Sequence, residues 1–112
     1  MGRSRIYQHH KIPITVSQMV YALIRDYPRR KRIIEYSSAS SDSSCAECIR
    51  LNSIVDACID ESEAILGAII IQDIINQRGY DQSDACLYSS KNKYYNVKNQ
   101  FIEDIAISCN WI

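Results

Sequence analysis

Glycine and proline are scarce in this chain, with three Gly and two Pro among 112 residues. The tight turns of a β-rich domain draw on these residues, because Gly adopts positive φ and Pro presets φ for a turn. The composition therefore favours helices. Apolar residues make up 46% of the chain, which excludes a disordered protein. The length suits one compact domain, with or without a flexible arm.

A long apolar run is also absent. The longest, residues 64–71, contains Gly67 and falls well short of the roughly 20 residues that span a bilayer. The N-terminal residues MGRSRIYQHHKIP are polar and basic, without the apolar core of a secretory signal. We therefore expect a cytoplasmic protein that does not associate with a membrane.

Histidine is confined to His9 and His10, so no Ser-His-Asp set can be assembled, and no Gly-rich phosphate loop occurs. The five Cys include the C-x-x-C pair Cys45 and Cys48, but a zinc site needs four ligands and no second pair is suitably spaced. Four of the Cys fall in apolar helical patterns, where a free thiol acts as a small hydrophobe. We expect no enzyme activity, no metal and no cofactor.

The net charge is zero, but the charges are unevenly distributed. Residues 1–36 hold eight basic and two acidic side chains, a sum of +6, whereas residues 37–90 hold two basic and nine acidic, a sum of −7. Residues 91–112 hold three Lys followed by two acids, a sum of +1. Such asymmetry allows electrostatic steering toward phosphate in spite of the neutral total.

Apolar residues recur at helical spacing along most of the chain, and a polar Ser-rich stretch interrupts them. The stretch at 63–76 is apolar nearly all round, which predicts a central buried helix, and Gly79 is expected to end it in a left-handed conformation. We predict four parts: a flexible basic arm at 1–15, an N-terminal helical segment at 16–36, a serine-rich linker at 37–44, and a helical bundle at 45–112.

Residues 81–108 have the layout of a helix-turn-helix, with a short helix at 83–87, a turn, and a longer helix from 91 to about 108. Leu87 is predicted to pack in the core, and Ser90 to cap the second helix. The residues predicted to face inward on that helix are Tyr94, Val97, Phe101, Ile102 and Ile105. The predicted fold class is therefore all-α, a small helical bundle with a C-terminal helix-turn-helix.

The outward side of residues 91–108 points to DNA. No acidic residue lies between Asp84 and Glu103. Asn is a poor helix former, so helix stability does not explain three of them on one face. Asn reads adenine in the major groove and Lys contacts phosphate. The predicted DNA-binding residues are Ser90, Lys91, Asn92, Lys93, Tyr95, Asn96, Lys98 and Asn99. The alternative is a solvated surface helix that happens to be rich in Asn and Lys.

A second basic cluster, Arg29, Arg30, Lys31 and Arg32, offers contacts to the phosphate backbone of DNA. The alternative, which we favour, is the solvated face of a helix near the acidic middle of the chain.

Two segments resemble phage transcriptional regulators of the ArpU/RinA type. They are VYALIRDYPRRKRIIE at 20–35 and LYSSKNKYYNVKNQFIEDIA at 87–106. The resemblance implies a C-terminal helix-turn-helix similar to region 4 of sigma factors, which binds specific DNA and controls phage late genes inside a bacterial host. Within the family pattern Ser90 matches the capping Ser, Tyr94 and Tyr95 the tyrosine pair, Lys98 the lysine, and Phe101 and Ile102 the anchoring pair.

The leading hypothesis is a sequence-specific transcriptional regulator of phage type that binds double-stranded DNA. A homodimer is plausible, since paired half-sites are the usual way for a short helix-turn-helix to gain contact with DNA. The alternative is a helical protein-interaction module that binds a host factor, such as host RNA polymerase, without binding DNA.

Overall fold

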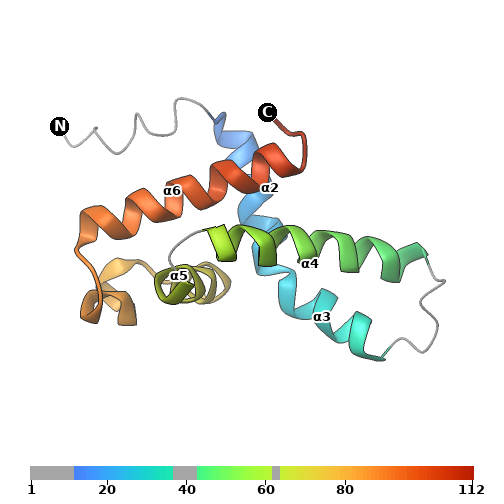
Figure 1. Ribbon diagram of the computed structural model, residues 1–112, viewed down its shortest axis with the longest axis horizontal. Helices are drawn as coiled ribbons and strands as arrows, with labels where there is room; N and C mark the ends of the chain where they lie inside the picture. Colours follow the sequence, from blue (N-terminus) through green and yellow to red (C-terminus); the bar gives the residue numbers. More distant parts are fainter. Residues whose placement is uncertain (1–11, 37–42, 62–63) are drawn as a thin grey trace.

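The computed structural model of the chain describes residues 12–36, 43–61 and 64–112, and these form helices without a strand (Figure 1). The predicted all-α class is confirmed. The α-helices are α2 (Ile14–Arg25), α3 (Tyr27–Tyr36), α4 (Ser43–Glu61), α5 (Ala64–Ile75) and α6 (Lys91–Ser108), and two 3₁₀ turns, η2 (Tyr80–Gln82) and η3 (Asp84–Leu87), lie between α5 and α6.

Helix α6 packs against α2, α4 and α5. Figure 1 shows it crossing α2 and running beside α4, while α3 packs along α4 at the far end of the molecule. Its inward residues are buried as predicted, except Val97, which is half-buried against the same core. The buried side chains that α6 contributes to the core are Tyr94, Phe101, Ile102, Ile105 and Ala106.

Helix α5 packs against α2, α4, α6 and η3, as expected of a central helix, but it is not buried on all sides as its apolar sequence predicts. Its buried side includes Leu66, Ile70 and Ile74, but Ile65 on the other side is 65% exposed. One side of α5 therefore remains uncovered within the part of the chain that the structure describes.

The predicted N-terminal segment at 16–36 consists of α2 and α3, which meet at Asp26. Pro28 has no N–H to donate to the carbonyl of Ile24, so one continuous helix is disfavoured here. Helix α2 packs on α5 and α6. Ile12 and Ile14 were assigned from the sequence to the basic arm. In the structure Ile12 is buried, and Ile14 is the first residue of α2. Residues 1–11 of the arm and 37–42 of the serine-rich linker lie outside the described ranges.

The last turns of α5 and α6 end in the same way, and Gly79 is not the left-handed residue that the sequence predicts. Gln77 takes positive φ after α5 (56°) and Asn110 after α6 (60°), whereas Gly79 has φ −98°. The N–H of Arg78 donates to the carbonyl of Asp73, which together with the Gln77–Ile74 bond forms a Schellman motif. The chain reverses two residues earlier than predicted, because this motif forms at Gln77.

Candidate nucleic-acid interface

The segment that leads into α6 was expected to hold the first helix of a helix-turn-helix. It consists instead of η2 and η3, separated by Ser83, whose Oγ accepts the N–H of Ala85 at 2.9 Å. Ala85 is fully buried and η3 packs on α5. Leu87 is 76% exposed, so its predicted core contact is wrong. A four-residue 3₁₀ turn has no second turn to carry Leu87 onto the core, and the predicted two-helix arrangement is not confirmed.

Helix α6 begins where the sequence predicts. The Oγ of Ser90 accepts the backbone N–H of Lys93 at 3.2 Å, and Ser90 has the extended backbone typical of an N-cap. The first turn of α6 contains no acidic residue but does contain Lys91 and Lys93. These ammonium groups add to the positive end of the helix dipole, so the start of α6 favours an anionic partner.

Four of the predicted DNA-binding residues are exposed in the first two turns of α6. Lys91, Asn92, Lys93 and Asn96 are all exposed, and so is the capping residue Ser90. The Asn amides carry both donors and acceptors, which suits the edges of base pairs, and the Lys ammonium groups suit phosphate oxygens. The structure therefore brings four of the eight predicted residues together as an accessible surface, which we call the outer α6 face.

Lys98 does not belong to the outer α6 face. Its Nζ lies over the rings of Tyr21, Tyr94 and Tyr95, at 5.5, 6.0 and 5.6 Å from their centroids. Lys98 follows Tyr94 by four residues, so the helical period places both on the inward side. Burial lowers the pKa of Lys98. Lys98 is therefore set apart from the exposed residues of the outer α6 face, and its contact with phosphate stays a prediction.

Tyr95 and Asn99 are half-buried. The Tyr95 ring meets the Tyr94 ring edge-on, with centroids 5.0 Å apart and an interplanar angle of 90°. A Cβ placed on Gly79 would lie 3.8 Å from the Tyr95 hydroxyl, so this tyrosine extends toward the turn after α5. Tyr95 therefore packs against the bundle and lies beside the outer α6 face, not at its centre.

A buried carboxylate, Asp73, was not identified from the sequence. It is fully buried on α5, its Oδ2 accepts the Tyr94 hydroxyl at 2.8 Å, and its Oδ1 lies 3.2 Å from Nε of Arg78. Burial and the bond to Asp73 raise the pKa of Tyr94. The sequence did contain a signal for its burial. Asp73 follows Ile70 by three residues and Leu66 by seven, which places it on the apolar side of the helix.

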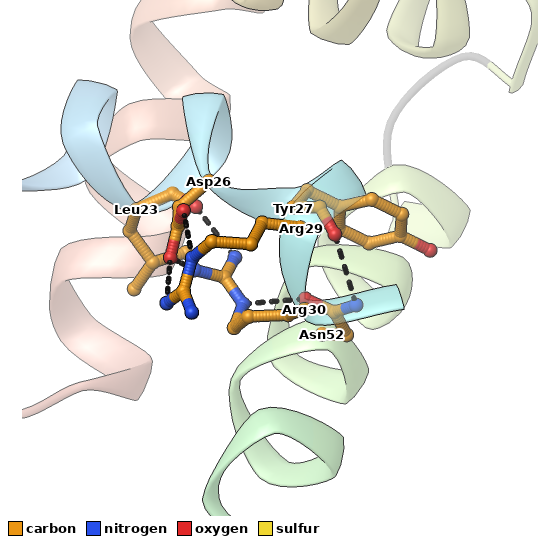
Figure 2. Close-up of polar contacts among 6 residues, drawn as sticks. All are labelled: Leu23, Asp26, Tyr27, Arg29, Arg30 and Asn52. Atoms are coloured by element: carbon orange, nitrogen blue, oxygen red, sulfur yellow. Dashed lines mark hydrogen bonds and ion pairs between the residues drawn. The ribbon is translucent and has the colours of Figure 1, made fainter. Parts of the chain in front are cut away.

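The basic cluster on α3 is partly internal (Figure 2). Arg30 is 3% exposed, its Nε donates to Oδ1 of Asn52 at 2.6 Å, and its Nη2 donates to the carbonyl of Leu23. Arg30 is therefore neither a phosphate contact nor part of a solvated face, because its guanidinium joins α2, α3 and α4. Arg29 is exposed but makes a two-pronged ion pair with Asp26, with both N–O distances 2.7 Å.

Lys31 and Arg32 are exposed on the same helix. Figure 1 shows α3 and the start of α6 at opposite ends of the long dimension of the molecule. The two basic clusters that the sequence suggested as joint DNA contacts are therefore not one surface.

Tyr27, at the start of α3, donates to Oδ1 of Asp56 at 2.7 Å, and burial with this bond raises the pKa of Tyr27 to about 12.

Within the described ranges, no group of three or more His, Cys, Asp or Glu is placed to hold a metal ion. The Cys in these ranges are not joined in disulfides, and Cys45, Cys48 and Cys58 are buried. None of the helices that the structure describes is long and apolar enough to cross a membrane. Comparison of the chain with protein-family models, curated proteins and solved structures gave no match.

Proposed function

We propose that this chain is a DNA-binding transcriptional regulator of phage type, and that the outer α6 face enters the major groove. One observation carries the proposal: Lys91, Asn92, Lys93 and Asn96 are exposed together at the start of a capped helix, with no carboxylate on α6 before Glu103. In this role Asn92 and Asn96 read base edges, and Lys91 and Lys93 hold phosphates. A symmetric dimer on paired half-sites extends the contact.

The rigid support for α6 favours this role. Base readout needs a helix whose side chains are held in one register. The hydroxyl of Tyr94 is bonded to Asp73, and Phe101, Ile102 and Ile105 are buried against the bundle. Packing therefore fixes the buried side of α6, and this holds the exposed side chains in one register.

The test is fluorescence anisotropy with labelled duplexes selected from a random-sequence library, measured across a salt series. A DNA binder loses affinity as salt rises, with a slope of about 0.9 per phosphate contact on a log–log plot. The double variant Lys91→Ala/Lys93→Ala is expected to lower that slope by about 2. The matched control is Lys31→Ala/Arg32→Ala, which removes the same charge from α3 and is expected to leave the slope nearly unchanged.

Asn92→Ala and Asn96→Ala test sequence reading separately from phosphate contact. Each substitution is expected to reduce the difference in binding free energy between selected and unselected duplexes by about 1–3 kcal/mol. The slope of affinity against salt should stay nearly constant. Equal binding of all duplexes by the unmodified protein would refute sequence-specific recognition. No binding of any duplex at low salt would refute the proposal as a whole and favour a protein-interaction module.

A further inference from the structure

A pocket of about 320 Å³ lies on the inward side of α6, beside the last turns of α2 and α5. Asn92, Lys93 and Asn96 of the outer α6 face point away from this side of the helix, whereas Lys91 precedes Lys98 by seven residues and lies on the same side, two turns away. The pocket is lined by Tyr21 and Arg25 of α2, Asp73 and Ile74 of α5, Gln77, Arg78 and Gly79 of the following turn, and Lys98 of α6.

The lining carries a surplus of positive charge. Arg25, Arg78 and Lys98 supply three cations against the single carboxylate of Asp73, which leaves two positive charges. The Asp73 carboxylate is already engaged, since its two oxygens bond to the Tyr94 hydroxyl and to Nε of Arg78. Its negative charge still acts on an incoming anion, which is why the surplus is two positive charges and not three.

Two of these cations form no ion pair within the described residues. Arg25 is exposed, and the Lys98 ammonium lies over three tyrosine rings and feels the attraction of the Asp73 carboxylate. Both groups keep N–H donors that can bind an anion in the pocket. Arg78 uses its Nε on Asp73, and a guanidinium carries further donors on its terminal nitrogens.

We propose that this pocket binds a small-molecule phosphate ester as a dianion. Two surplus positive charges match the charge of a phosphate monoester, and guanidinium groups bind phosphate oxygens in a two-pronged geometry. A volume of about 320 Å³ accommodates a phosphate with a small organic group, which the Tyr21 ring can contact. The pocket lining shares no residue with the outer α6 face, so the existence of the pocket does not depend on DNA binding.

The test is a ¹H–¹⁵N NMR titration of the full chain with inorganic phosphate and then phenyl phosphate, at an ionic strength held constant with sodium chloride. We expect saturable shifts at Gly79 and Lys98. Arg25→Gln should weaken the apparent affinity about tenfold, the loss expected for one charged hydrogen bond. The matched control, Arg32→Gln, removes the same charge from an exposed position on α3 and should leave the affinity unchanged.

Lys98→Met should also weaken phosphate binding about tenfold. Arg25 is exposed, so Arg25→Gln should not affect folding. Its effect on phosphate affinity tests the pocket even if Lys98→Met lowers stability. Shifts that do not saturate, or that spread equally to Lys31 and Arg32, would show nonspecific ion association and overturn the proposal. Equal effects of Arg25→Gln and Arg32→Gln would do the same.

A further titration distinguishes a site for a small-molecule phosphate from a contact with the phosphate backbone of DNA. The phosphate titration is repeated with the protein saturated by a duplex, provided that a duplex is bound. We expect the pocket shifts to persist, since the duplex would contact residues of the outer α6 face, and none of these lines the pocket. Displacement of phosphate by the duplex would contradict a separate small-molecule site.

Discussion

The hydroxyl of Tyr94 donates a hydrogen bond to Oδ2 of Asp73 across 2.8 Å, joining the first turn of α6 to the last turn of α5 in the interior. This contact fixes the end of α6 that carries the exposed Lys and Asn residues. Without it, Asp73 would keep only the 3.2 Å contact from Arg78.

Tyr94→Phe removes the hydroxyl and keeps the ring. It should lower the free energy of unfolding by about 1–3 kcal/mol, because the buried Oδ2 of Asp73 loses its donor. Urea denaturation followed by circular dichroism measures the change. Tyr88→Phe is the matched control, since Tyr88 is 63% exposed and should change stability little. Equal effects of the two variants would mean that the buried hydrogen bond contributes nothing.

Arg30→Met keeps an unbranched apolar stem but removes the guanidinium. We expect a loss of about 2–3 kcal/mol in the free energy of unfolding, since Oδ1 of Asn52 and the carbonyl of Leu23 lose their donor. Arg32→Met, on the exposed side of α3, should stay within about 0.5 kcal/mol of the unmodified protein. The two are compared by urea denaturation. A loss of the same size in Arg32→Met would point to net charge and not to the buried contacts.

Lys98 makes stability depend on pH in a defined direction. Burial lowers its pKa in the folded chain, so between that lowered value and 10.5 the unfolded chain binds more protons than the folded chain. Stability from this group therefore rises with pH across that window. The free energy of unfolding of the unmodified protein minus that of Lys98→Met should increase as pH rises from neutral toward 10.5, in buffers free of phosphate and sulfate. If that value stays constant or decreases, the burial of the charged amine is contradicted.

Ser90→Ala removes the N-cap of α6. The expected cost is about 1 kcal/mol, because the N–H of Lys93 loses its acceptor. Amide hydrogen exchange should speed up most in the first turn of α6. Ser89→Ala provides the control, since the Ser89 hydroxyl makes only an exposed bond to the carbonyl of Ser90. Equal exchange rates in both variants would argue against a capping role.

Local signals predicted α6 well and its surroundings less well. Ser90 and the spacing of Tyr94, Phe101 and Ile105 fixed the start and inward side of the helix, because caps and periodicity act over a few residues. The unexpected positions of Arg30 and Lys98 have another origin. Each depends on contacts with distant elements: Arg30 meets Asn52 on α4, and Lys98 meets Tyr21 on α2. A single sequence does not reveal which polar side chain will find a buried partner far along the chain.

The most direct test of the proposed DNA interface is an NMR titration of the full chain with its best-binding duplex. The outer α6 face predicts the largest shifts at Lys91, Asn92, Lys93 and Asn96, with Lys31 and Arg32 on α3 nearly unchanged. Shifts centred on α3, or distributed evenly over all exposed basic residues, would contradict recognition through α6.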